Sequence, residues 1–268
     1  MLSMRTANKA WLAIPLTVAI AAPARAQDAN AIMKKSTSVY AGAKSYEGIY
    51  EMDMAMGSMG TVSLTVAVKR LGTTKSSSKT TANGTPSGTM SAGAAMMNVQ
   101  IIDDGKTMWT YMPGMNKYMK RPHVAGATGV GMMGMMGDPA QAAGTYKLLP
   151  STTIDGKPVF ALQLTGLGGA KVNAQASAYL KNAKVTVYVD KATYRFRQMS
   201  MTMAQPAGMP GQPGQSASMT MTMKLKSEKF NTPIPESYFK FSPPPGATEL
   251  KGVPGMGGGS GGLPGFGR

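Results

Sequence analysis

Methionine alternates with small or polar residues in three short stretches: Met52-Asp-Met-Ala-Met56, Met199-Ser-Met-Thr-Met203 and Met219-Thr-Met-Thr-Met223. Successive side chains of a β-strand point to opposite faces, so each stretch predicts a strand with its methionines on one side. Three such strands indicate a sheet with one apolar and adaptable face, because the methionine side chain is unbranched and polarizable. Two kinds of ligand suit such a face: a lipid, or a soft metal ion such as copper.

The two-residue period extends well beyond these stretches, and short turns such as Asp103-Asp-Gly105 predict hairpins between neighbouring strands. Strands are expected at residues 46–56, 61–69, 96–102, 106–111, 117–120, 146–154, 158–164, 184–189, 194–203 and 218–230. Residues 72–93 are rich in Ser, Thr, Gly and Lys and are expected to form a loose edge strand with a long loop. Residues 29–44 have the apolar spacing of a helix.

This pattern predicts a mainly β (α+β) fold. We expect a single curved antiparallel sheet of about 10–11 strands that closes towards a barrel, preceded by one helix. Residues 122–144 break the pattern with Gly and Met, and Asp138-Pro139 starts a short helical segment, so this region is expected to be a mobile flap.

The ends of the chain have compositions of their own. Arg5 and Lys9 precede an apolar run at 11–22 and the sequence Ala24-Arg-Ala26, which predicts a signal peptide over residues 1–26; an uncleaved anchor is the alternative. The folded domain is then expected at 27–250 and a Gly/Pro-rich disordered tail at 251–268. We therefore expect an exported, periplasmic protein, and with no cysteine it has neither a disulfide nor a lipid attached through cysteine.

The chain is strongly basic, with a formal charge of +16. Without the basic residues Arg5, Lys9 and Arg25 of the leader, 25 basic residues face 12 acidic ones, a charge of +13. Such an excess favours anionic partners. Export and the dispersed lysines argue against nucleic acid, so anionic lipid headgroups are the expected partner, and solubility of a solvated strand face is the alternative.

Two segments near the C-terminus resemble a known family. They are Asp190-Lys-Ala-Thr-Tyr-Arg-Phe-Arg-Gln198 and Asn231-Thr-Pro-Ile-Pro-Glu-Ser-Tyr-Phe-Lys-Phe-Ser-Pro-Pro-Pro-Gly-Ala247, and the hairpin Asp104-Gly-Lys-Thr-Met-Trp109 adds to them. They resemble the LolA-like outer-membrane lipoprotein-sorting superfamily. The resemblance implies an incomplete β-barrel with a helical or loop lid, and a periplasmic carrier that holds acyl chains in an apolar cavity. Relatives with this fold bind lipids or act as envelope-stress sensors, so fold alone does not identify the cargo.

We therefore expect a carrier for lipid or acylated lipoprotein, with the methionine stripes as the cavity lining. A sensor or scaffold that binds a membrane-protein partner in the envelope is an alternative. The chain is expected to be a monomer without a cofactor. The expected cavity residues are Met52, Met54, Met56, Met199, Met201, Met203, Met219, Met221, Met223, Trp109 and Tyr111. The same methionines could instead simply fill a core.

A Cu(I)-binding protein is the second alternative, because thioethers are soft ligands for Cu(I). Its expected site is the flap, at Met132, Met133, Met135 and Met136. The single histidine, His123, is expected to be an exposed loop residue. No catalytic residues are expected, because the chain lacks a cysteine nucleophile and the Gly-x-Ser-x-Gly, His-Glu-x-x-His and phosphate-loop motifs.

Overall fold

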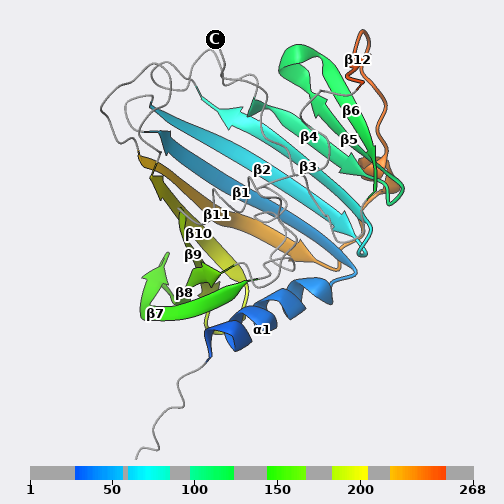
Figure 1. Cartoon of the computed structure of the whole chain (residues 1–268). Helices are drawn as coiled ribbons and strands as arrows, with labels where there is room; N and C mark the ends of the chain where they lie inside the picture. Colours follow the sequence, from blue (N-terminus) through cyan, green and yellow to red (C-terminus); the bar gives the residue numbers. More distant parts are fainter. Residues whose placement is uncertain are drawn as a thin grey trace, which may run out of the picture.

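The computed structural model of the chain describes residues 28–56, 60–84, 97–123, 144–166, 183–204 and 218–251. The predicted leader, residues 124–143 of the predicted flap and residues 252–268 of the predicted tail lie outside the described residues. In the described part, one α-helix, α1 (Ala29–Ala41), accompanies a single sheet of 12 strands (Figure 1). No helix of that part is long and apolar enough to cross a membrane.

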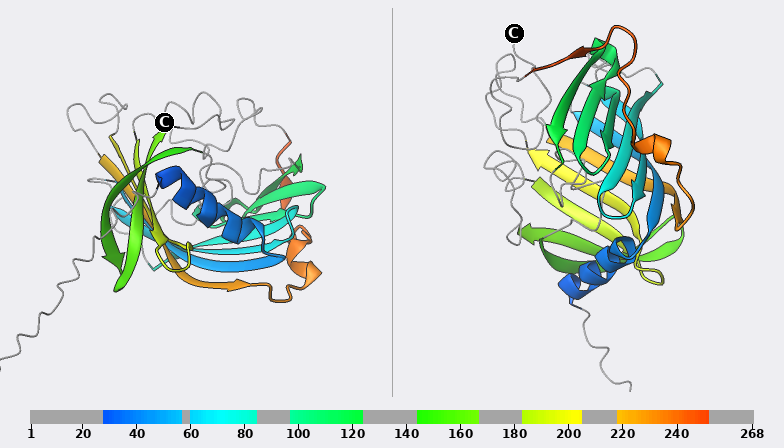
Figure 2. Two further views of the ribbon diagram at one scale, coloured as in Figure 1. Left: turned by 90° about the horizontal axis from the view of Figure 1, so that it is seen from below. Right: turned by 90° about the vertical axis from the view of Figure 1, so that its right-hand side faces the viewer.

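The strands follow one another along the sheet in the order β12-β6-β5-β4-β3-β2-β1-β11-β10-β9-β8-β7. Their bounds are β1 (Ser45–Met56), β2 (Thr61–Leu71), β3 (Lys75–Asn83), β4 (Val99–Asp103), β5 (Thr107–Met112), β6 (Lys117–Pro122), β7 (Thr145–Ile154), β8 (Lys157–Gly166), β9 (Ala183–Asp190), β10 (Phe196–Ala204), β11 (Ser218–Phe230) and β12 (Thr248–Glu249). Seen from below, the sheet curves into a trough that contains α1 (Figure 2). The predicted mainly β fold with a single curved sheet is confirmed. The sheet is open, and it is mixed because β12 runs parallel to β6.

The prediction for residues 72–93 was wrong about the position of the strand. β3 is an interior strand that pairs with β2 along its whole length and with β4 from Ser76 to Thr80. The backbone ladder supplies this pairing whatever the side chains are, so a Ser- and Thr-rich strand can still be central. Its contribution to the concave face is small: Thr80 is buried there and Ala82 is partly buried.

The helix α1 lies in the trough because one side of it is apolar. The Asp28 carboxylate accepts a hydrogen bond from the Asn30 N–H at 3.0 Å and caps its first turn. Ile32 and Met33 are buried against Leu162 of β8 and Val189 of β9. The helix therefore covers the β8–β9 side of the concave face.

Both edges of the sheet are poorly suited to pair with a further strand. On β7, the Asn30 side chain accepts the Tyr146 N–H at 2.9 Å, and Pro150, which has no N–H, lies in the irregular stretch between Leu149 and Thr152. On β6, the short strand β12 covers the first two residues and the last residue is Pro122. Such edges disfavour edge-to-edge association.

The chain after β11 crosses the convex face, where the 3₁₀-helix η6 (Glu236–Phe239) lies (Figure 2). Asn231, with a φ of 57°, makes the sharp exit from β11, and its side chain accepts the Lys44 N–H at 2.9 Å. Phe239 is buried, and Phe241 packs on aromatic rings of β5 and β6. The segment 231–247 thus packs against the convex face of the sheet.

The other segment used for the resemblance is also structural. Buried Asp190 accepts hydrogen bonds from the Thr193 N–H and hydroxyl at 2.9 and 3.0 Å, and from the Arg197 guanidinium at 3.0 Å. Burial alone would raise the pKa of Asp190, but these bonds outweigh it and hold the pKa below its ordinary value. Asp190 therefore stays ionised and fastens the turn between β9 and β10.

Candidate functional site

The nine methionines of the three stripes stand side by side on the neighbouring strands β1, β11 and β10. Pairing across these strands forms three rows: Met52–Met223–Met199, Met54–Met221–Met201 and Met56–Met219–Met203. Directly paired residues of antiparallel strands point to the same face, so the first two of these rows each bring three thioethers to the same face. We refer to these as the first, middle and end rows.

The rows lie on the concave face, and the methionines of the first and middle rows, with Met219, belong to one apolar cluster with Tyr40 of α1. Burial decreases along the strands: in the first row, Met52, Met223 and Met199 are 3%, 1% and 8% exposed. In the middle row, Met221 and Met201 are 2% and 3% exposed, while Met54 is half-buried. In the end row Met219 and Met203 are half-buried, and the side chain of Met56 lies outside the described residues. The methionine surface therefore becomes more accessible towards the C-terminal ends of β1 and β10 and the N-terminal end of β11, which we call the strand ends.

Branched aliphatic side chains continue the rows on both sides. Val62 and Leu64 of β2 pair with Met54 and Met52. On the other side, Val187 and Val185 of β9 pair with Met199 and Met201. The flexible methionines thus occupy the middle of an apolar floor whose borders consist of stiffer residues.

Towards α1, the same strands carry aromatic residues instead of methionine. Tyr46 and Tyr50 lie on the concave face of β1, where their hydroxyls hydrogen-bond to each other. Tyr40 of α1 packs on Tyr46 with ring centroids 5.4 Å apart, and its hydroxyl accepts the Phe196 N–H at 2.9 Å. The Arg70 guanidinium donates to the Tyr40 carbonyl near the end of the helix. The sequence prediction did not include these residues, although Tyr46 and Tyr50 have the same even spacing as Met52.

A carboxyl group is buried at this end. Glu228 has a side chain only 7% exposed, and its Oε2 accepts a hydrogen bond from the Tyr40 hydroxyl at 3.2 Å. Burial raises its pKa, and the Arg195 guanidinium at 3.6 Å offsets only part of this effect. Burial also raises the pKa of both Tyr40 and Tyr46 far above the usual range, so these hydroxyls stay neutral.

Trp109 and Tyr111 lie on the opposite face from the methionine rows. Direct pairing from strand to strand connects Trp109 with Glu47 of β1, through Ile102, Ser77 and Lys69. Directly paired residues share a face, and Glu47 points away from the concave face because it follows Tyr46, which points into it. Both aromatic rings pack against Phe241, with centroid distances of 6.0 and 6.1 Å. The structure thus assembles the methionines and separates them from these two residues.

His123 is not an exposed loop residue, contrary to the sequence expectation. Its side chain is 12% exposed, and Nδ1 lies 2.9 Å from Oδ2 of Asp103, which is 1% exposed. Asp103 Oδ1 also accepts the Gly105 N–H at 2.9 Å, so the pair supports the β4–β5 turn. Among the residues that the structure describes, no group of three or more His, Cys, Asp or Glu could hold a metal ion. Met132, Met133, Met135 and Met136 lie outside those residues.

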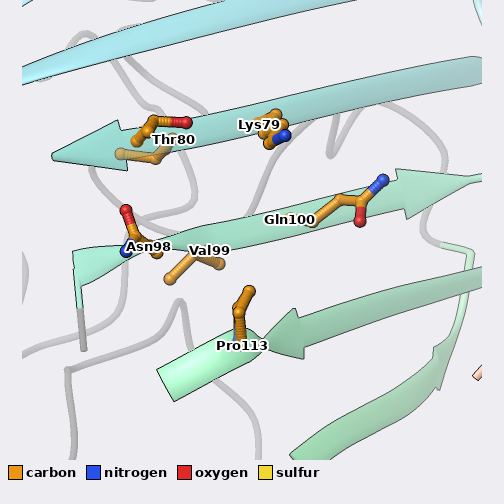
Figure 3. Close-up of a pocket in the computed structure, with 7 residues that line it drawn as sticks. Lys79, Thr80, Asn98, Val99, Gln100 and Pro113 are labelled. Atoms are coloured by element: carbon orange, nitrogen blue, oxygen red, sulfur yellow. The ribbon is translucent and has the colours of Figure 1, made fainter. Parts of the chain in front are cut away.

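A pocket of about 250 Å³ lies where β3 and β4 diverge, beside the turn at Pro113 (Figure 3). Thr80, Asn98 and Lys79 contribute to its lining. The Asn98 side chain accepts the Ala82 N–H at 2.8 Å, and this hydrogen bond connects the residue before β4 to β3. None of the predicted site residues lines this pocket.

No family model matches the sequence, and no curated protein does. Solved structures similar to the chain include a LolA superfamily protein from Nitrosomonas europaea, 15% identical, with a TM-score of 0.38 over 81% of this chain and 99% of that one. The lipoprotein LppX from Mycobacterium tuberculosis is 11% identical, with a TM-score of 0.40 over 77% and 97%. The Pseudomonas aeruginosa MucA/MucB complex gives 10% identity and a TM-score of 0.40 over 80% and 61%. These neighbours include the superfamily that the C-terminal segments resemble; likeness at this level identifies no ligand.

Proposed function

We propose that this chain is an exported binding protein, not an enzyme, that carries lipid or lipoprotein acyl chains on its concave face. The observation that supports this proposal is the alignment of methionine into three rows on the side of the sheet that encloses α1. A curved sheet with such a face offers a continuous apolar surface of adaptable shape.

The ligand would enter at the strand ends, where Met54, Met203 and Met219 are half-buried. The buried methionines of the first row then have to turn aside to make room. Three rotatable bonds make this movement inexpensive for methionine, whereas branched side chains would resist it. Burial of each acyl CH₂ contributes about 0.8 kcal/mol, so ten methylenes supply on the order of 8 kcal/mol against this rearrangement.

The polar parts of such a ligand would remain near the strand ends. At the other end, Tyr40, Tyr46 and Tyr50 fill the space beneath α1 and are hydrogen-bonded. The basic charge of the chain favours ligands with anionic headgroups. Membrane-derived lipids or acylated lipoproteins combine both properties.

The direct test is organic extraction of the purified protein followed by mass spectrometry, together with titration of a fluorescent fatty acid. We expect a co-purified lipid and saturable uptake. Met54→Gln/Met201→Gln/Met221→Gln should weaken uptake by about tenfold or more, because an unpaired buried amide costs about 1–3 kcal/mol. If that triple variant does not fold, Met54→Gln alone, at a half-buried position, tests the same point.

Two controls accompany this test. Met54→Leu/Met201→Leu/Met221→Leu keeps volume and apolarity and should bind within about threefold of the unchanged protein. Trp109→Phe changes the convex face and should leave uptake unaltered. Absence of both co-purified lipid and fatty-acid uptake would contradict the proposal, as would a glutamine variant that binds normally. A pull-down that recovers a stable protein partner and no lipid would favour the scaffold alternative.

A further inference from the structure

The first and middle methionine rows each align three thioether side chains from three adjacent strands on one face of the sheet. Directly paired Cβ atoms lie about 4.5–5.5 Å apart, so the two outer side chains of a row begin about 10 Å apart. Three sulfurs around one ion, with bonds near the ~2.3 Å found between zinc and sulfur, stand about 4 Å from each other. Outer side chains that lean towards the central strand can reach this spacing without any movement of the backbone.

Thioether sulfur is a neutral, soft ligand, which suits monovalent soft ions such as Cu(I) and Ag(I) and does not suit hard cations such as Ca²⁺ or Mg²⁺. It carries no proton to lose. Binding through thioethers therefore stays constant across the pH range in which histidine and carboxylate ligands compete with protons.

Access distinguishes the three rows. All the side chains of the first row are at most 8% exposed, so an ion has no open approach to them. The middle row combines two buried side chains, Met221 and Met201, with the half-buried side chain of Met54 on β1. It is also adjacent to half-buried Met219 and Met203, through which an ion can be handed inwards.

We propose that the middle row, Met54–Met221–Met201, binds one Cu(I) or Ag(I) ion through its three thioether sulfurs. This site depends on the alignment of three strands and is separate from the predicted flap site at Met132–Met136. It goes beyond the proposed carriage of lipid, because it requires sulfur itself and not only an apolar surface.

The test is titration of the full chain with Ag(I), and with Cu(I) under anaerobic conditions, against a competing chelator. We expect one ion per chain at the row, bound more tightly than about 1 μM and with the same affinity at pH 5.5 and pH 7.5. With methionine methyl groups labelled with ¹³C, the ion should shift the resonances of Met54, Met201 and Met221 before those of the other methionines.

Matched variants separate this site from general effects of methionine. Met54→Leu/Met201→Leu/Met221→Leu removes the three sulfurs at similar side-chain volume and should lose the ion. Fatty-acid uptake is measured separately on the unchanged protein, so the two proposals can fail independently. Met33→Leu/Met108→Leu/Met112→Leu removes the same number of buried methionines elsewhere and should bind the ion normally. Affinity weaker than about 1 μM in the unchanged protein, or equal binding by the row variant, overturns the proposal. Should the row variant not fold, methyl shifts confined to other methionines overturn it.

Discussion

The concave face has two ends, and the same three strands, β1, β11 and β10, build both of them in different ways. Near α1, aromatic rings and a buried carboxyl group are joined by hydrogen bonds of defined direction. Towards the other ends of these strands, the described side chains on this face are methionines, whose thioethers need no hydrogen-bond partner. One end therefore fixes the position of the helix, and we expect the surface at the other end to be able to change shape.

The difference follows from the side chains themselves. A tyrosine has two side-chain torsions and a hydroxyl that needs a partner when buried, so its position is specific. Methionine has three torsions and a thioether that is satisfied by apolar contact. At comparable burial, substitutions should thus be costly at the tyrosine end and tolerated at the methionine end.

The largest effect is expected for Tyr40→Ala. Tyr40 is 1% exposed, and its ring centroid lies 5.4 Å from that of Tyr46 and 5.5 Å from that of Phe230. Removal of this ring therefore leaves a cavity beneath α1. We expect a loss of about 3–5 kcal/mol in the free energy of unfolding, measured with urea. Tyr40→Phe keeps the ring but removes the hydroxyl that bonds to Glu228 and to the Phe196 N–H, and should cost about 1–3 kcal/mol. Equal costs for both variants would mean that packing contributes little.

A matched pair at equal burial gives the next comparison. Met223 and Tyr50 are each 1% exposed on the concave face. Met223→Leu conserves volume and should cost less than about 1.5 kcal/mol. Tyr50→Leu removes the hydroxyl partner of Tyr46 and should cost clearly more, since an unpaired buried hydroxyl alone costs about 1–3 kcal/mol. If Met223→Leu lowers the free energy of unfolding as much as Tyr50→Leu does, the methionine rows are a rigid core and not an adaptable surface.

The smallest change at neutral pH is expected for Glu228→Gln. The amide can still accept the Tyr40 hydrogen bond, and the ion pair that is lost involves a 40% exposed Arg195, so stability should change by less than about 1 kcal/mol. The pH dependence is the informative measurement. Burial raises the pKa of Glu228 in the folded protein above the ordinary 4.5, so the native state holds its proton more tightly than the unfolded state does.

Stability from this group is therefore fully present below pH 4.5 and is lost as the pH rises through the folded pKa. As the pH rises from 4.5 through the folded pKa of Glu228, the unchanged protein should therefore lose stability relative to Glu228→Gln. Asp190, whose pKa is lowered, has the opposite dependence but is common to both proteins. A difference between the two proteins that does not vary with pH would show that Glu228 is not buried as described.

Much of the fold could be predicted because strand alternation is a local property. The bounds of β11 were predicted to the residue, and β1, β7 and β9 to within one residue at either end. The central position of β3 was missed because its sequence lacks apolar alternation, and β12 because two residues are too short to form a pattern. For His123, its pairing with Asp103 20 residues away could not be read from its local sequence.

The candidate site shows the same division. The alternation of each methionine stripe determined that its side chains share one side of a strand. Trp109 and Tyr111 are also expected at the cavity, whereas the pairing across five strands places them on the other face. Cross-strand register depends on pairing partners that are distant in the chain, and no local pattern specifies these partners.

The sequence by itself thus determined that this protein has strands with methionine on one side and a curved, mainly β sheet. Only the tertiary structure decided that β1, β11 and β10 are neighbours, with Met54 opposite Met221 and Met221 opposite Met201. The physical reason is that side-chain alternation follows from backbone geometry within a strand. The alignment of strands about 170 residues apart depends instead on which apolar faces the whole chain can bury together.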